Sequence, residues 1–264
     1  NPHRVVYPMK RPHDKIGDAD AWERCSWDEA LDLIMDKWDE ITGKYGRKTM
    51  AIHVGTGRDG MLSQDFQLSI FRTPNLAYTQ SGYACYQPRM MASQMVLGAL
   101  YPELDYAGGL EGGYDDPQYQ VPELMVIWGK APLESNPDGF FGHSIIDLMK
   151  RGARLFSVDP RVNWLNSRSE LQLRVRNGTD AALAMACCNI IINEGLYDAD
   201  FVEKWTYGFD EFKERVSAMT PEKAAEICEV PVEDIYTFAR EYAKAKPASI
   251  AWGLAFDQNT NGMQ

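Results

Sequence analysis

The stretch that decides the fold is Glu123-Leu-Met-Val-Ile-Trp128-Gly129, which is followed along the chain by Arg154-Leu-Phe-Ser-Val158-Asp159. Each is a short apolar run that ends at a Gly or Asp, which is typical of a buried strand. A loop rich in Gly, Pro and Asn and a helical pattern over 139–151 lie between them. This length of crossover predicts parallel strands. Ligands on such sheets bind at the carboxyl ends of the strands, here the loops that begin at Gly129 and Asp159.

The remaining pattern extends this α/β interpretation to the whole chain. Further strands are predicted near 49–54, 171–175 and 248–252, and further helices over 27–43, 180–193 and 231–245. Ser26 with Glu29 forms a capping box at the start of the first of these helices. A chain of 264 residues with 45% hydrophobic residues has room for one large α/β domain or two smaller ones.

Charge and cysteine usage exclude several classes of protein. With Lys plus Arg at 27 and Asp plus Glu at 38, the formal net charge is -11, which disfavours duplex DNA and anionic membranes as partners. The 5 cysteines include no C-x-x-C pair, so a zinc ribbon and a thioredoxin motif are excluded. No stretch approaches about 18 uncharged apolar residues, so we expect no membrane span. Because the chain starts at Asn1 without a Met, we expect it to be cut from something longer, which leaves export open.

A glycine-rich turn follows the first predicted strand of the chain. Gly55-x-Gly57-x-x-Gly60 matches the form of a dinucleotide-binding fingerprint, and this suggests a NAD(P)-dependent dehydrogenase as one alternative. The fingerprint also needs an acidic residue about 20 positions later to bind the ribose, and 76–84 contains none. A turn near some other ligand is therefore the preferred interpretation.

The loop after Trp128 is a stronger candidate for binding an anion. It leads from a strand into a helix, so its backbone N–H groups and the helix dipole favour a phosphate, and Lys130 and Ser135 add donors. The alternative is an ordinary connecting loop. Asp159 and Arg161 end the next strand, where an acid suits ribose hydroxyls or a purine edge, although it also suits an N-cap.

Two further motifs carry polar or reactive groups. Gly178-Thr179-Asp180 opens an apolar helix, so Thr179 or Asp180 caps that helix or, alternatively, Asp180 accepts two hydrogen bonds from a guanine. Cys85 lies in a loop with Arg89 nearby, whose charge favours a thiolate, whereas most lone cysteines are small buried hydrophobic residues. Cys187 and Cys188 lie together on an apolar helix and are interpreted as helix core.

In their order, these motifs resemble the catalytic subunit of the dimethyl sulfoxide reductase family of molybdopterin oxidoreductases. The resemblance covers essentially the whole chain. The motifs that carry it are Arg4-x-x-Tyr7-Pro8-x-Lys10-Arg11, Ser26-Trp27-Asp28-Glu29-Ala30, Thr73-Pro74-Asn75, Cys85-x-x-Pro88-Arg89, Trp128-Gly129, Val158-Asp159-Pro160-Arg161, Gly178-Thr179-Asp180-Ala181-Ala182-Leu183, Glu194-Gly195-Leu196-Tyr197-Asp198 and Gly253 with Gln258-x-x-Asn261-Gly262.

The resemblance implies a fold and a cofactor. It implies Rossmann-like parallel-sheet domains, one inserted into another. The inserted domain, over 115–245, would bind molybdopterin guanine dinucleotide. The outer α/β domain, made of 1–114 and 246–264, would be incomplete and would contain the strands near Ile52 and Ile250. The cofactor would be Mo or W held by two molybdopterin guanine dinucleotides. The residues that the resemblance assigns are Cys85 as metal ligand, Arg89 beside it, and Gly129, Lys130, Ser135, Asp159, Arg161, Gly178, Thr179 and Asp180 along one dinucleotide arm.

The chain also departs from the family pattern. Ala131 stands where the family loop commonly has Asn, and the four-cysteine segment for a 4Fe-4S cluster, which in the family precedes the Arg4 motif, is not in this sequence. We therefore expect the fragment alone to be inactive. In the intact protein the resemblance implies two-electron chemistry on a small-molecule substrate, with electrons passing to an iron–sulfur subunit. A hydratase or dehydroxylase of the acetylene hydratase branch and a non-catalytic nucleotide-binding module remain as alternatives, and either the bacterial cytoplasm or the periplasm is possible.

Overall fold

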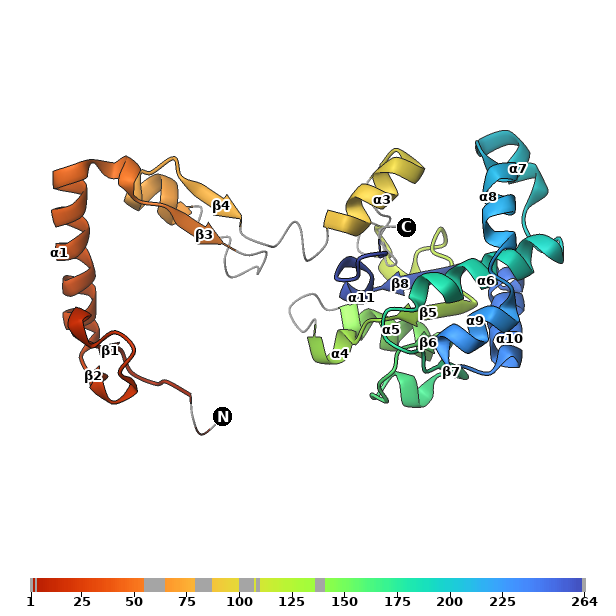
Figure 1. Ribbon diagram of the computed structural model, residues 1–264, viewed down its shortest axis with the longest axis horizontal. Coiled ribbons are helices and arrows are strands. Elements are labelled where there is room, and N and C mark those ends of the chain that lie inside the picture. Colours follow the sequence, from red (N-terminus) through yellow and green to blue (C-terminus); the bar gives the residue numbers. More distant parts are fainter. Residues whose placement is uncertain are drawn as a thin grey trace. The chain divides into compact units, whose positions relative to one another are not determined.

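The computed structural model describes residues 2, 4–54, 65–78, 87–99, 107, 110–135 and 141–262. The chain divides into two compact units, residues 1–79 and 80–264 (Figure 1).

The first unit is dominated by the long helix α1 (Trp27–Tyr45). The predicted cap is confirmed, since the Ser26 hydroxyl oxygen accepts a hydrogen bond from the Glu29 backbone N–H at 3.1 Å. Of the side chains of α1, Trp38 is buried, with its ring 4.5 Å from that of Phe71. A short antiparallel pair precedes the helix, β1 (Met9–Lys10) with β2 (Glu23–Arg24). Single 3-10 turns form at His13–Lys15, Ala19–Ala21 and Arg47–Thr49.

A second, parallel pair completes this unit. β3 (Ile52–Val54) pairs with β4 (Leu76–Tyr78), and a π-helix at Phe66–Phe71 precedes β4. The Thr73-Pro74-Asn75 motif connects the two strands, because the Thr73 hydroxyl and the Asn75 amide both donate to the Met50 carbonyl, at 2.7 and 3.1 Å. The motif therefore fixes the start of β3.

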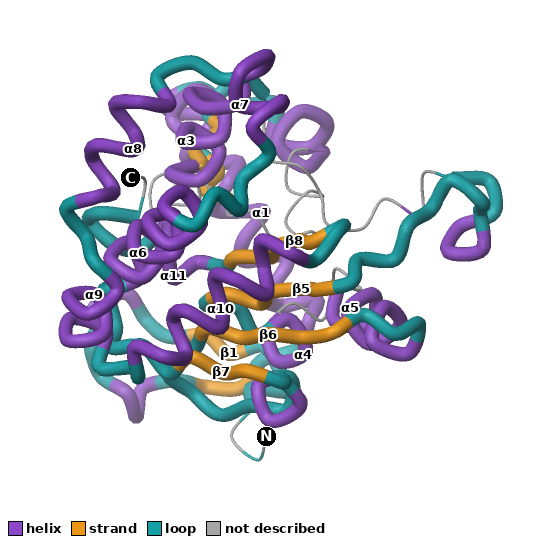
Figure 2. The backbone as a smooth tube through the Cα atoms, turned by 90° about the vertical axis from the view of Figure 1, so that its right-hand side faces the viewer, coloured by secondary structure: helices purple, strands orange, loops and turns teal. Residues whose placement is uncertain are grey.

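The second unit contains a parallel sheet of four strands. They are β5 (Leu124–Trp128), β6 (Arg154–Val158), β7 (Leu171–Leu173) and β8 (Ala248–Trp252), in the spatial order β7-β6-β5-β8 (Figure 2). Every pair is parallel. The predicted parallel sheet is confirmed.

The helices of this unit provide the crossovers and the covering layers. α3 (Gln87–Leu97) and a 3-10 turn (Gly113–Asp115) precede the sheet, and α4 (Pro132–Ser135) and α5 (Phe141–Lys150) join β5 to β6. A 3-10 turn (Asn166–Arg168) leads to β7. Between β7 and β8 lie α6 (Asp180–Asn193), α7 (Ala199–Trp205), α8 (Phe209–Ser217), α9 (Pro221–Cys228) and α10 (Val232–Lys244), and α11 (Leu254–Asp257) follows β8.

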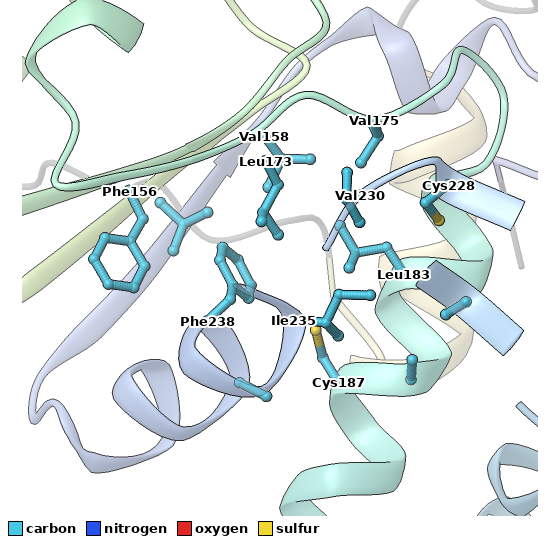
Figure 3. Close-up of a cluster of buried hydrophobic side chains, with 14 of the residues drawn as sticks. Phe156, Val158, Leu173, Val175, Leu183, Cys187, Cys228, Val230, Ile235 and Phe238 are labelled. Carbon is cyan, nitrogen blue, oxygen red and sulfur yellow. The ribbon is translucent and has the colours of Figure 1, made fainter. Parts of the chain in front are cut away.

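The sheet is buried on both faces. Side chains of β5 alternate between two cores: Leu124, Val126 and Trp128 join one, whereas Met125 and Ile127 join the other. The first core is closed by α6, α9 and α10, which contribute apolar residues including Leu183, Cys187, Cys228, Ile235 and Phe238 (Figure 3). The second is closed by Ile145 and Leu148 of α5. This two-sided burial explains why β5 is an unbroken apolar run.

The strand predicted at 248–252 forms in the second unit, where β8 pairs with β5 along its whole length, from Leu124↔Ala248 to Trp128↔Trp252. The family resemblance assigns this strand and the strand near Ile52 to one outer domain, and that assignment stays a prediction. An apolar pattern predicts a strand without naming its neighbour. Over the described residues, no helix is both long and apolar enough to span a bilayer.

Candidate functional site

The carboxyl ends of the four strands meet at one edge of the sheet. Trp128 of β5 is in register with both Val158 of β6 and Trp252 of β8, and Val158 is in register with Leu173 of β7. The predicted site residues that follow these strands are therefore brought to the same edge. This edge is the candidate functional site.

Two glycines form a close crossing at this edge. Gly129 has a φ of 58°, and a Cβ there would lie 2.4 Å from the Ala255 Cβ. Gly253 donates its N–H to the Trp128 carbonyl at 3.0 Å, and a Cβ on Gly253 would lie 2.4 Å from the Gly129 carbonyl oxygen. The loops after β5 and β8 thus pass at backbone contact, which only glycine allows. Gly253 is a structural requirement that the sequence motif alone did not explain.

The two donors expected in the loop after Gly129, Lys130 and Ser135, lie in different surroundings. Lys130 is half-buried in this loop, directly after Gly129. The Ser135 hydroxyl donates to the Ala131 carbonyl at 2.9 Å, inside the turn that forms α4. Ser and Thr hydroxyls in helices often bond back in this way to the carbonyl four residues earlier. The hydrogen of Ser135 is therefore used locally in this structure, and the assignment of Ser135 to the dinucleotide arm stays a prediction.

Asp159 and Arg161 form a hydrogen-bonded ion pair. Asp159 is 2% exposed, and its Oδ1 accepts hydrogen bonds from the Arg161 backbone N–H at 2.9 Å and from Nε at 3.1 Å, while Oδ2 accepts from Nη2 at 3.0 Å. These bonds, together with the attraction of the carboxylate, raise the pKa of Arg161. Most of the Arg161 side chain is exposed. The buried acid therefore holds a guanidinium at the surface, and the ribose contact that the sequence suggested for Asp159 stays a prediction.

Two amides, which the sequence did not single out, fix this turn. Gln172 Nε2 donates to the Arg161 carbonyl at 2.7 Å, and Asn166 Nδ2 donates to the same carbonyl at 2.9 Å. Asn166 is buried. Their spacing from Asp159 carries no recognised motif, so only the folded structure reveals them.

Asp180 is joined to the end of β5. Its Oδ1 accepts a hydrogen bond from the Trp128 indole N–H at 2.8 Å, although the two residues are 52 positions apart. Asp180 is the first residue of α6 and is nearly buried. Within the described part of the chain, Oδ2 has no hydrogen-bond partner. One oxygen is thus fixed and the other remains able to accept.

The rest of the Gly178-Thr179-Asp180 turn is held locally. Gly178 has a φ of 82°, and a Cβ there would lie 3.7 Å from Asn259 Oδ1. The Thr179 hydroxyl donates to the Arg176 carbonyl at 2.7 Å and does not cap the helix. The capping alternative therefore fails for Thr179. Cys187 is buried in the core as predicted, and burial raises the pKa of its thiol.

Arg89 is paired with an acid that the sequence did not indicate. Its backbone N–H donates to Asp257 Oδ1 at 3.0 Å, and its Nε lies 3.4 Å from Asp257 Oδ2. Burial raises the pKa of Asp257, and the Arg89 contacts oppose that rise only partly. Cys85 and the turn Gly55-x-Gly57-x-x-Gly60 lie outside the described residues. In the part of the chain that is described, no cluster of three or more His, Cys, Asp or Glu side chains could bind a metal.

A pocket lies beside these groups. It has a volume of about 290 Å³, and Arg89, Trp128, Trp252 and Phe256 are among the side chains that line it. Trp128 and Trp252 are the last residues of β5 and β8. The pocket therefore opens at the strand edge that carries Asp180.

Comparison with known proteins finds relatives over the whole chain. A family model described as molybdopterin oxidoreductase matches residues 4–264. Acetylene hydratase of Syntrophotalea acetylenica is 32% identical over 98% of this chain and 33% of its own length. Dopamine dehydroxylase of Eggerthella lenta is 34% identical over 78% of this chain and 19% of its own. A probable dimethyl sulfoxide reductase chain of Escherichia coli is 31% identical over the full chain and 34% of its own length.

A solved structure is similar as well. Acetylene hydratase from Pelobacter acetylenicus matches with a TM-score of 0.65 and 30% identity, over 98% of this chain and 34% of the other. The chain thus spans about a third of the length of the relatives that match it along its whole length.

Proposed function

The chain belongs to the molybdopterin oxidoreductase family, and we propose that, within a longer enzyme, it binds one guanine dinucleotide arm of a bis-molybdopterin guanine dinucleotide cofactor that carries Mo or W. The observation that carries this proposal is the hydrogen bond between the Trp128 indole and Asp180 at the carboxyl edge of the sheet. It holds a carboxylate at the edge where ligands of parallel sheets bind.

The groups at this edge fit the chemistry of a guanine nucleotide. The N1–H and the 2-amino group of guanine both donate, and the Asp180 carboxylate accepts. The exposed Arg161 guanidinium, held by buried Asp159, suits a phosphate, for which a planar set of N–H donors is well matched. Lys130 adds a second positive charge in the loop after β5. Gly129 and Gly178 both have a positive φ, and a side chain on Gly129 would collide with Ala255.

The metal ligand in this proposal is Cys85, whose thiolate is a soft donor suited to Mo or W. The bound metal would supply two-electron chemistry on a small substrate. This chain supplies the thiolate, the dinucleotide edge and the pocket beside Trp128. A 4Fe-4S cluster and an electron-transfer subunit belong to the same proposal for the whole protein.

The proposed domain arrangement follows from the same relationship. We infer that the β5–α10 segment is a Rossmann-like domain inserted into a longer α/β domain, to which residues 1–114 contribute. The pairing of β8 with β5 supports a boundary of the inserted domain beyond residue 245.

A hydratase or dehydroxylase is the second candidate activity. It is supported by the names of two relatives, acetylene hydratase and dopamine dehydroxylase, which are 32% and 34% identical to this chain. A reductase is supported by the dimethyl sulfoxide reductase relative at 31%. Assays of the full-length enzyme with acetylene, a catechol and a sulfoxide separate these candidates: turnover of the sulfoxide alone would contradict the second.

The experiment that tests cofactor binding is Asp180→Asn in the full-length protein. Asn replaces one acceptor oxygen with an amide donor, so a guanine edge loses a hydrogen bond to a charged partner, and we expect guanine nucleotide content to fall by roughly 10-fold. The content is measured by chromatography of the nucleotides released on denaturation. Unchanged content, or released adenine nucleotides, would contradict the proposal.

The matched control is Asp198→Asn. Asp198 caps α7, where its Oδ1 accepts a hydrogen bond from the Phe201 N–H at 2.9 Å. Asn caps a helix about as well as Asp does. The control therefore makes the same chemical change away from the site, and nucleotide content should remain at the wild-type level.

A further inference from the structure

Arg161 is held on its backbone as well as on its side chain. Asp159 accepts from the Arg161 backbone N–H at 2.9 Å and also from Nε and Nη2 of the guanidinium. The Arg161 carbonyl accepts two further hydrogen bonds, from Gln172 Nε2 at 2.7 Å and from Asn166 Nδ2 at 2.9 Å. The side chain is nevertheless mostly exposed. The proposed function uses the guanidinium, but it leaves the two bonds to the carbonyl unexplained.

Gln172 extends the contact between β6 and β7 beyond the end of the sheet. β7 is the edge strand beside β6 (Figure 2). The backbones pair as far as Asp159, whose N–H donates to the Leu173 carbonyl at 3.1 Å. The Gln172 side chain then donates to the Asp159 carbonyl at 3.3 Å and to the Arg161 carbonyl at 2.7 Å. One side-chain amide of β7 therefore holds two carbonyls of the turn that carries Arg161.

Asn166 holds the same carbonyl from the opposite side of the chain, the turn that precedes β7. It is 3% exposed, and within the described part of the protein its Oδ1 is buried without a hydrogen-bond partner. A buried polar atom without a partner lowers the stability of a fold, so a similar apolar side chain would fill this position at least as well. The amide is better explained by the Arg161 carbonyl that it fixes than by stability.

The contacts to Arg161 leave part of its guanidinium available. Nε and Nη2 donate to Asp159, whereas Nη1 has no hydrogen-bond partner among the described residues. Glu134, in the loop region after β5, is close enough to add a smaller attraction that also raises the pKa of Arg161. The guanidinium therefore lies near that loop. A long side chain that is already ordered loses less freedom when it binds a ligand.

We propose that Gln172, together with Asn166, is a positioning residue that fixes the backbone of Arg161 and so directs its guanidinium to a phosphate of the guanine nucleotide at the sheet edge. This inference rests on the proposed function. Neither amide contacts the nucleotide, and both act through Arg161. The expected effect of removing them is therefore on phosphate binding alone, without an effect on recognition of the guanine base.

The test is Gln172→Met in the cofactor-free full-length protein, with GDP and guanosine as the two probes. Met is about as long as Gln and donates no hydrogen bond. We expect the Kd for GDP, measured by equilibrium dialysis, to rise about 5-fold, which is the size of the cost of ordering one long side chain on binding. The Kd for guanosine, which has no phosphate, should stay at the wild-type value. A merely structural role would weaken both ligands alike.

A matched control and a second variant accompany this measurement. Gln118→Met makes the same change at an exposed position whose side chain has no hydrogen-bond partner among the described residues, and it should leave both Kd values unchanged. Asn166→Leu removes the other donor to the Arg161 carbonyl and should act in the same direction as Gln172→Met. If Gln172→Met does not accumulate, Asn166→Leu decides by itself. A wild-type Kd for GDP, or an equal loss of affinity for GDP and guanosine, would overturn the positioning role.

Arg161→Ala separates this inference from the proposed function. We expect Arg161→Ala to raise the Kd for GDP roughly 30-fold, because charged hydrogen bonds to a phosphate are lost. Adding Gln172→Met to Arg161→Ala should have no further effect, since residues that act through one another are not additive. A further loss in the double variant would refute the positioning role.

The remaining outcomes assign a failure to one proposal or the other. If the wild-type protein does not bind GDP, or if Arg161→Ala binds it as wild type does, the phosphate contact in the proposed function is wrong. If Arg161→Ala weakens GDP binding while Gln172→Met and Asn166→Leu do not, that contact stands and the positioning role of the two amides is refuted.

Discussion

At the scale of single residues, the Trp128–Asp180 bond links the last residue of β5 to the first residue of α6. A nearly buried carboxylate without a partner is costly, and the indole N–H supplies one partner while leaving the second oxygen able to accept. The indole therefore orients the group that we propose to recognise guanine.

Trp128→Phe tests this orientation. Phe keeps an aromatic ring against Phe238 and removes the N–H, so Asp180 loses its partner. We expect the free energy of unfolding to fall by about 1–3 kcal/mol, measured by urea denaturation. Trp205→Phe, at a position that is 77% exposed, should change it by less than about 0.5 kcal/mol. Equal effects of the two substitutions would refute the role of the hydrogen bond.

Gly253→Ala tests the crossing of the two strand-edge loops. The added Cβ would lie 2.4 Å from the Gly129 carbonyl oxygen, so the loop after β5 must move. We expect the guanine nucleotide content of the full-length protein to fall, measured after denaturation. Gly43→Ala, in α1, meets no atom within 4 Å and should leave that content unchanged. A wild-type nucleotide content in Gly253→Ala would show that the crossing is irrelevant to binding.

At the scale of elements, α10 closes the first core through Phe238, which lies beside Phe156 (Figure 3). The centroid of the Phe238 ring is 5.9 Å from that of Trp128 and 5.9 Å from that of Phe156. Phe238→Ala should lower the free energy of unfolding by about 3–5 kcal/mol, because it leaves a cavity against the sheet. Thermal or urea unfolding measures the loss. Phe201→Ala, on α7 and 56% exposed, should cost much less, and similar losses would contradict the assigned core.

The junction of α6 and α10 predicts a pH dependence. Hydrogen bonds from the Arg240 guanidinium, which include Nε to Glu194 Oε2 at 2.9 Å, lower the pKa of Glu194. A carboxyl whose pKa is lowered by folding stabilises the fold above its unfolded-state pKa of about 4.3, and this contribution is lost as the pH falls through the lower folded-state value.

Glu194→Gln should therefore lower the Tm at neutral pH, and the difference from wild type should shrink as the solution is acidified through and below about pH 4, where Glu194 becomes protonated. The measurement is the Tm of both proteins across that range. The effect at neutral pH should be small, because exposed pairs contribute about 0.2–1 kcal/mol. A Tm difference that grows toward acid pH would contradict a stabilising Glu194 carboxylate.

At the scale of the whole molecule, the sequence predicts what is local and misses what joins distant segments. The strands 124–128 and 154–158 are predictable because each is a buried apolar run that ends at a Gly or an Asp. β4 has only three residues, which is too short for a strand pattern to be recognised in the sequence. The pairing of β8 with β5 could not be predicted, because strand neighbours are set by packing rather than by periodicity. The bonds from Trp128 to Asp180 and from Arg89 to Asp257 cross 52 and 168 positions, which no local motif records.

The central claim is that this chain binds a guanine dinucleotide arm of a Mo- or W-containing cofactor. The most direct measurement is the content of the purified full-length wild-type protein: its metal by mass spectrometry, and its nucleotides by chromatography after denaturation. We predict Mo or W together with guanine nucleotide in excess over the metal, as two dinucleotides per metal require. Protein that contains no Mo or W, or that releases only adenine nucleotides, would contradict it.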